Sequence, residues 1–165
     1  MTERIKARFT LHTAIALAED FHRYQKDRSG EPYINHLRAV MNQLQGEETQ
    51  MAGVLHDIIE DTQMTTVELI KMGCPESVVD ALKLVTHPLF FNDDQYLEMI
   101  KEIADSKNQI AIDVKWADLT HNSDLSRTKN PNDNDLKRQA KYLRAKEILK
   151  PFVSEYLLQG TLDKL

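Results

Sequence analysis

The chain has 165 residues, 41% hydrophobic and 28% charged, which is typical of one soluble globular domain. Its net charge of −5 argues against a general nucleic-acid binder, and no uncharged apolar run approaches the roughly 20 residues of a membrane-spanning helix. The start, MTERIKARFT, lacks the apolar stretch of a secretory signal, and the single cysteine, Cys74, cannot form an internal disulfide. We therefore expect a single domain over residues 1–165, located in the cytoplasm, without nucleic-acid or membrane partners.

Apolar residues recur at helical spacing along the chain, whereas alternating β-branched runs are scarce. Thr65 with Glu68 and Asn92 with Gln95 have the spacing of helix-capping pairs, and Pro151 is expected to kink or split the last helix. Polar loops are expected over 25–32 and 128–135. The pattern predicts an all-α bundle of seven to nine helices. These helices are expected over residues 9–24, 33–44, 48–60, 65–73, 75–85, 92–104, 107–121 and 136–158.

The most informative segment is MAGVLHDIIEDT, at residues 51–62, because four ionisable side chains interrupt an apolar helix: His56, Asp57, Glu60 and Asp61. Helical spacing would place them on adjoining faces. Two carboxylates about 5 Å apart repel by roughly 3 kcal/mol at an effective dielectric near 20, so three of them favour a compensating cation. A divalent metal is one such cation, and this donor set suits Mn²⁺, Fe²⁺ or Zn²⁺. The alternative is a solvated helix end with ordinary acids.

Two further residues favour the metal interpretation. His36 lies upstream in EPYINHLRAV, and Asp118 lies downstream in VKWADLTHNSDLSR, each within its own predicted helix. Alone, His36 would be a hydrogen-bonded core histidine and Asp118 an acid on a helix surface. A histidine, a His-Asp pair and a distant aspartate on separate helices can nevertheless converge on one ion inside a bundle.

Three segments, in this order and spacing, resemble those of HD-domain phosphohydrolases: GEPYINH at 30–36, LHDIIEDT at 55–62 and VKWADLTHN at 114–122. Over about residues 10–150 the chain is similar to the hydrolase domains of RelA/SpoT proteins and to the small alarmone hydrolases. The resemblance implies an HD-type helical fold and one divalent metal, usually Mn²⁺. The ligands that it implies are His36, His56, Asp57 and Asp118.

The resemblance also implies that Glu60 and Asp61 position or deprotonate the attacking water, and that Asn122 holds the ribose or the phosphate. Lys115 matches a lysine that is common in the family, without an assigned role. Arg127 is either a contact to a substrate phosphate or an exposed surface residue. The predicted substrate contacts are Asn122, Lys115, Arg28, Lys26 and Arg127.

Two departures from the family pattern concern the base pocket. Where relatives carry an Arg-Lys pair this chain has Asp27 and Arg28, so that Arg28 or Lys26 would have to replace the arginine that stacks on guanine. Leu119 replaces the basic residue that follows the Ala-Asp pair. The family removes the 3′-pyrophosphate of (p)ppGpp, leaving GDP or GTP, and some members remove a phosphate from NADPH.

We therefore expect metal-dependent hydrolysis of a phosphate or pyrophosphate ester of a purine nucleotide, with (p)ppGpp first among the candidates. The alternatives are a phosphatase for NADPH or deoxynucleotides, a phosphodiesterase, or a nucleotide-sensing or partner-binding module with vestigial hydrolysis. The oligomeric state, the physiological metal and any antagonism of a partner synthetase stay open.

Overall fold

The computed structural model describes residues 7–88 and 92–162 and confirms the all-helical prediction. Within these ranges no β-strand forms, and the only strand-like feature is an isolated antiparallel bridge between Lys26 and Pro32. None of the helices in this part of the chain is long and apolar enough to cross a bilayer. The α-helices are α1 (Leu11–Phe21), α2 (Ile34–Gln43), α3 (Glu47–Leu55), α4 (Ile58–Asp61), α5 (Thr66–Lys71), α6 (Glu76–Val85), α7 (Asp93–Asp105), α8 (Gln109–Asn122), α9 (Asp133–Leu149) and α10 (Glu155–Leu162), and 3₁₀ helices lie at Leu125–Arg127 and Lys150–Phe152.

Helix starts follow the local sequence signals. Thr65 accepts a hydrogen bond from the backbone N–H of Glu68, whose carboxylate accepts one from the Thr65 N–H in return, and Asn92 forms the equivalent pair with Gln95. Such reciprocal bonds satisfy N–H groups that a helix end leaves without partners. Both predicted capping pairs are therefore confirmed.

Most predicted helix boundaries shift by one to three residues, and two differences are larger in consequence. The helix expected over 48–60 is two helices, because α3 ends at Leu55 and α4 begins at Ile58. Between them Asp57 has φ −102° and ψ 0°, a conformation between the helical and extended regions that interrupts regular helical hydrogen bonding. Helix α9 begins at Asp133, inside the predicted loop 128–135, because Asn132 caps it. The predicted split at Pro151 is present as a 3₁₀ turn between α9 and α10.

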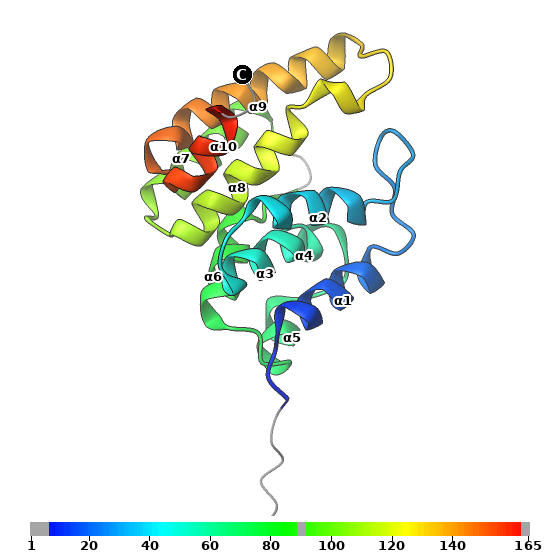
Figure 1. The fold of residues 1–165 in the computed structure, drawn as a ribbon, viewed down its shortest axis with the longest axis vertical. Helices are drawn as coiled ribbons and strands as arrows, with labels where there is room; N and C mark the ends of the chain where they lie inside the picture. The colour runs from blue at the N-terminus through cyan, green and yellow to red at the C-terminus, as the bar shows by residue number, and fades with distance from the viewer. Residues whose placement is uncertain (1–6, 89–91, 163–165) are drawn as a thin grey trace, which may run out of the picture.

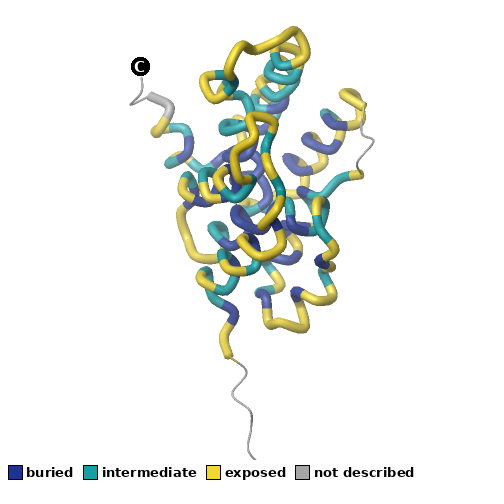
Figure 2. The backbone as a smooth tube through the Cα atoms, turned by 90° about the vertical axis from the view of Figure 1, so that its right-hand side faces the viewer, coloured by how far each residue is buried: buried dark blue, intermediate teal, exposed yellow. Residues whose placement is uncertain are grey.

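Helix α3 lies at the centre of the bundle (Figure 1). It packs against α1, α2, α6 and α8, while α8 also packs against α9. The tube view shows the buried positions gathered inside, with the connecting loops exposed (Figure 2). Along α8 every residue from Ala111 to Leu119 is buried. Polar side chains on this stretch are therefore shielded from solvent and need partners within the protein.

Gly53 allows α3 to approach α2 closely. A Cβ atom on Gly53 would lie 2.5 Å from Leu44 Cδ1 and 3.3 Å from the Met41 Cα, both shorter than ordinary contacts. This approach brings the rings of His36, on α2, and His56, directly after α3, to a centroid separation of 5.3 Å. The absence of a side chain at residue 53 therefore helps to position two of the predicted metal ligands.

We expect Gly53→Ala to reduce the free energy of unfolding by about 1–3 kcal/mol relative to Gly160→Ala, because extra volume in a filled core forces neighbouring groups apart. Gly160 is a matched control, since it also lies in a helix and a Cβ there meets nothing within 4 Å. Urea denaturation measures both variants. Equal stability of the two variants would contradict the close-packing argument.

Candidate metal centre and its cavity

Three buried side chains from three parts of the fold converge on one point. The potential ligand atoms of His36, His56 and Asp118 all lie within 4.8 Å of one another. The Nε2 atoms of His36 and His56 are 3.2 and 3.4 Å from Asp118 Oδ1. Two imidazoles and a carboxylate at this spacing form a donor set suited to a divalent transition metal.

Asp57 borders this group. Its Oδ2 atom is 3.1 Å from His56 Nε2 and 3.9 Å from His36 Nε2, and it also accepts a hydrogen bond of 2.6 Å from the Tyr33 hydroxyl. Burial acts to raise the pKa of Asp57, but the neighbouring His56 outweighs it and lowers that pKa to about 2. Asp57 is thus an ionised carboxylate beside the three converging groups.

His56 is oriented as a metal ligand would be. Its Nδ1 atom lies 2.7 Å from the Gly53 carbonyl oxygen, which can only accept, so Nδ1 carries a proton. The opposite atom, Nε2, is buried and has no hydrogen-bond partner among the described residues, although it faces the Asp57 and Asp118 carboxylates. A lone pair directed at carboxylate oxygens requires a cation between them or a proton on the ring. These residues therefore fit a divalent ion.

The pKa of His56 shows the same demand for positive charge. Burial alone would lower this pKa, but Asp57 and Asp118 together raise it well above the ordinary histidine value. A proton on His56 and a metal ion satisfy the same pair of carboxylates, so the two compete for this position.

Asp118 is held on both of its oxygens by residues of its own helix. Lys115 Nζ donates to Oδ2 at 3.0 Å, and Asn122 Nδ2 donates to Oδ1 at 2.8 Å. Burial would raise the pKa of Asp118, but Lys115 and His56 hold it well below its usual range. Lys115 and Asn122, predicted as substrate contacts, both line the cavity, but their resolved bonds orient this carboxylate.

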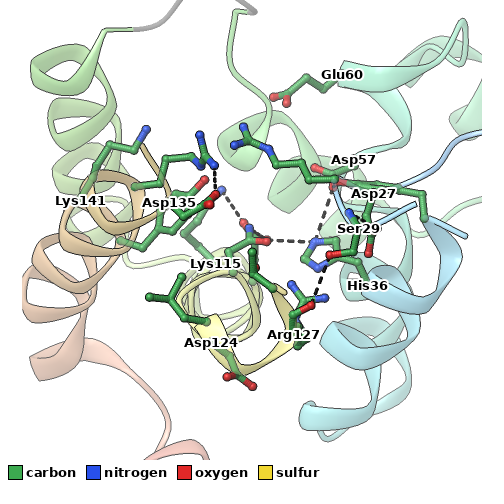
Figure 3. A pocket seen from close by; sticks show the side chains of 18 of the residues that line it. Asp27, Ser29, His36, Asp57, Glu60, Lys115, Asp124, Arg127, Asp135 and Lys141 are labelled. Carbon is green, nitrogen blue, oxygen red and sulfur yellow. Dashed lines mark hydrogen bonds and ion pairs between the residues drawn. The ribbon is translucent and has the colours of Figure 1, made fainter. Parts of the chain in front are cut away.

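A cavity of about 530 Å³ opens from the centre, within the size range of small-molecule sites. In Figure 3 His36 and Asp57 lie on one side, Lys141 and Asp135 on the opposite side, and Arg127 at the rim. The cationic residues that line it come from the loop after α1, from α8, from the first 3₁₀ helix and from α9: Lys26, Arg28, Lys115, Arg127, Arg138 and Lys141. Six carboxylates line the same cavity: Asp27, Asp57, Glu60, Asp118, Asp124 and Asp135. Two of the cations are already paired, Lys115 with Asp118 and Arg138 with Asp135. The cavity therefore combines a metal-type donor set with a wall of mixed charge that offers cationic contacts to an anion.

The structure separates the two predicted catalytic acids. Glu60 lines the cavity, and its Oε1 accepts a 3.0 Å hydrogen bond from the His87 backbone N–H. Asp61 is exposed, does not line the cavity and accepts a 3.0 Å bond from Gln25 Nε2. The Gln25 Oε1 in turn lies 2.7 Å from Nδ1 of the buried His22, which fixes the amide orientation. Asp61 thus anchors the loop after α1 to α4.

Asp27 and Leu119, the two residues that depart from the family pattern, have structural roles. The Asp27 Oδ1 atom accepts hydrogen bonds from the backbone N–H groups of Ser29 and Glu31, at 2.8 and 3.0 Å, so it shapes the loop that carries Arg28. Leu119 is fully buried in the core. Arg28 and Lys26 line the cavity, as does Arg127, whose carbonyl accepts a bond from the Ser29 hydroxyl.

Sequence reasoning did not identify the part of the cavity lining that α9 provides, which we call the α9 wall. Asp135, Arg138 and Tyr142 are spaced three and four residues apart, so they share one helix face, and all three line the cavity together with Lys141. The Lys141 ammonium lies 4.8 Å from the Tyr96 ring centroid and 5.3 Å from that of Tyr142. The spacing was a usable signal, but only packing shows which way this face points.

Residues 14–153 match the family model described as HD domain. A Synechocystis protein named probable guanosine-3′,5′-bis(diphosphate) 3′-pyrophosphohydrolase is 36% identical over 119 residues, covering 66% of this chain and 16% of that protein. The bifunctional (p)ppGpp synthase/hydrolase SpoT of Escherichia coli K12 is 33% identical over 124 residues, covering 68% of this chain and 17% of SpoT. The chain thus spans only about a sixth of the length of these relatives.

The fold is similar to that of a solved metazoan orthologue of SpoT, described as hydrolysing ppGpp. The TM-score is 0.76, with 96% of this chain and 93% of that chain covered at 21% sequence identity. At this identity the likeness establishes the arrangement of helices, whereas the chemistry rests on the residues described above.

We expect the metal-free protein to bind Mn²⁺ or Zn²⁺, and Asp118→Asn to weaken the affinity by at least about tenfold, because loss of the carboxylate charge removes a ligand. Asp113→Asn is a matched control: Asp113 is also buried on α8, but its carboxylate bonds to Gln109 and Ser154. Isothermal titration calorimetry measures both affinities. Undiminished binding by Asp118→Asn would contradict the ligand assignment.

Proposed function

Because the chain belongs to the HD-domain family and is related to the hydrolase domains of SpoT and RelA, we propose that it hydrolyses (p)ppGpp. The reaction would release the 3′-pyrophosphate and leave GDP or GTP. The observation that carries this proposal is the junction of a buried His/Asp cluster with a cavity that also carries five cationic side chains away from the cluster, among acidic ones. A phosphorylated nucleotide supplies the negative charge that those cations favour.

The ion, held by His36, His56 and Asp118 with Asp57 beside them, would acidify water and polarise the phosphoryl oxygens. Manganese is the metal we propose for the assay, following the resemblance to the family. The protein residues have separate tasks. Lys115 keeps the Asp118 carboxylate ionised, Asn122 helps to orient it, and the Tyr33 hydroxyl orients Asp57.

Glu60 is the residue that we assign as general base. It faces the cavity, lies outside the converging ligand group, and is fixed by the His87 N–H through one oxygen. A carboxylate in this position accepts the proton that the attacking water loses. Asp61 would act indirectly, through its bond to Gln25, by holding the loop that carries Lys26 and Arg28.

The substrate would extend from the metal centre towards α9. In this arrangement the 3′ ester bond that breaks would lie over the buried cluster, and the second phosphorylated arm would point across the cavity towards Lys141 and towards Arg138, which is paired with Asp135. Arg28 and Arg127 lie at the exposed rim, where a guanidinium can stack on a base or pair with a phosphate.

One observation favours a second candidate, a nucleotide-binding module without turnover. Asp27 occupies the position where relatives carry the base-stacking arginine, and its carboxylate is committed to the backbone of its own loop. Contact with the base would then fall to the other cations near this loop, Arg28, Lys26 or Arg127. Tight calorimetric binding of (p)ppGpp without any hydrolysis would favour this candidate and contradict the proposed activity.

We expect the Mn²⁺-loaded protein to convert ppGpp to GDP and pyrophosphate, and Glu60→Gln to lower kcat by about 10²–10⁴-fold, the usual contribution of a general base. The amide keeps the bond from the His87 N–H but cannot take up a proton. Glu102→Gln, at an exposed site on α7, is the control and should retain full activity. Ion-exchange chromatography quantifies the products. Equal rates for the two variants would exclude Glu60 as base.

The same assay applied to pppGpp, ppApp, NADPH and deoxynucleoside phosphates tests the substrate. We expect higher kcat/KM with ppGpp, pppGpp and ppApp than with the deoxynucleoside phosphates, because a phosphorylated arm on both sides of the ribose matches the two charged ends of the cavity. The resemblance to the family places the guanine nucleotides first among these. A preference for NADPH or a deoxynucleotide would keep the phosphohydrolase but replace the proposed substrate.

The pH profile should report Glu60. Burial raises the pKa of its carboxyl, only partly offset by the His87 N–H, so at a given acidic pH less of the base form is present than for an exposed glutamate. We therefore expect the acid limb of log kcat/KM to lie above the ordinary glutamate pKa, and this limb to be absent from the residual activity of Glu60→Gln. An unchanged acid limb in that variant would assign it to another group.

A further inference from the structure

A second histidine contacts the ring of His36 on the side away from the carboxylates. His121, on the last turn of α8, has its Nδ1 atom 2.7 Å from Nδ1 of His36, and the ring centroids are 4.9 Å apart. The other nitrogen of His36, Nε2, points to Asp118 at 3.2 Å. His36 therefore uses one nitrogen towards the candidate centre and the other towards His121.

Two nitrogens at 2.7 Å share one proton, and its location decides what His36 can do. If His121 donates the proton, His36 Nδ1 accepts it, and a neutral His36 must carry its own proton on Nε2, where it blocks a metal. If His36 donates instead, its Nε2 lone pair is free to coordinate. Ligation by His36 therefore requires His121 to act as the acceptor.

We propose that His121 is a positioning residue that keeps the proton of His36 on Nδ1 and thereby presents the Nε2 lone pair to a divalent metal. The acceptor is a neutral imidazole, whereas ligating histidines usually donate to a carboxylate, a backbone carbonyl or water. His121 itself lies outside the group of converging ligand atoms, so it acts through His36. The inference rests on the proposed metal centre but not on the identity of the nucleotide.

The first test is spectroscopic and uses the wild-type chain loaded with Zn²⁺, a diamagnetic probe. In protein labelled with ¹⁵N at histidine, nuclear magnetic resonance should show a proton on His36 Nδ1 and a scalar coupling across the hydrogen bond to His121 Nδ1. A proton resident on His121 Nδ1, or the absence of this coupling, overturns the proposal. No nucleotide is needed, so failure of the proposed hydrolysis leaves this result intact.

The second test uses two variants of the same shape. His121→Asn places an amide oxygen the same number of bonds from Cβ as Nδ1, so it restores an acceptor, whereas His121→Leu offers none. We expect His121→Leu to weaken Zn²⁺ binding by about 10–100-fold, as loss of such a partner does, and His121→Asn to recover most of that affinity.

Thr120→Val is the control on the same turn of α8, where the hydroxyl bonds to the Trp116 carbonyl, and its Zn²⁺ affinity should equal that of the wild type. Circular dichroism verifies folding of each variant. Equal affinity of His121→Leu and wild type, or equal losses in His121→Asn and His121→Leu, overturns the proposal. If His121→Leu does not fold, the nitrogen–nitrogen coupling in the wild type decides alone.

Discussion

The structure depends on burying opposite charges together at the junction of α2, α3 and α8. Removing a carboxylate from water costs several kcal/mol unless a cation or strong hydrogen bonds compensate it. Asp118 accepts hydrogen bonds from Lys115 and Asn122, and Asp57 accepts one from the Tyr33 hydroxyl. The Nε2 atom of His56 faces both carboxylates without a hydrogen-bond partner. A centre balanced in this way is stable only when a proton or a metal ion completes it, which makes the same feature a fold constraint and a binding site.

The surrounding elements serve this junction. Gly53 lets two helices approach closely enough for His36 and His56 to meet, and Asp57 and Glu60, which follow the break between α3 and α4, both line the cavity. Burial, His36 and Arg127 lower the pKa of His121 to about 4, and its Nδ1 atom lies 2.7 Å from Nδ1 of His36, on the side away from Asp118.

Much of this arrangement could be predicted from the sequence, because an ionisable residue inside an apolar helical segment is costly to bury unless a partner or a ligand compensates it. His36, His56 and Asp118 were identifiable in this way, as were the capping pairs at Thr65 and Asn92. The interruption at Asp57 could not be predicted, since an apolar pattern continues through it and the backbone change arises from tertiary packing. Asp61 still lies one helical turn after Asp57, with its backbone N–H bonded to the Asp57 carbonyl, so its exposure depends on how α4 packs, which the spacing alone does not reveal.

The α9 wall could not be predicted from the sequence, for a different reason. Its residues have an ordinary amphipathic pattern, and whether Arg138 and Lys141 face a cavity or solvent is set by how α9 packs on α7 and α8. Local sequence carries no information about that angle. Positions whose function depends on a distant helix are thus the ones that pattern reasoning misses.

The ligand atoms come from α2, from the α3–α4 junction and from α8, which are widely separated along the chain. An ion bound there would link distant segments of the chain. Its binding site exists only when all of these segments are folded. If the centre binds its ion as proposed, thermal stability would depend on metal supply: by mass action, an ion at 100 times its Kd adds about 2.7 kcal/mol to the stability of the native state. Removal of the ion by a chelator would lower the stability of the entire bundle and would not affect only the one site.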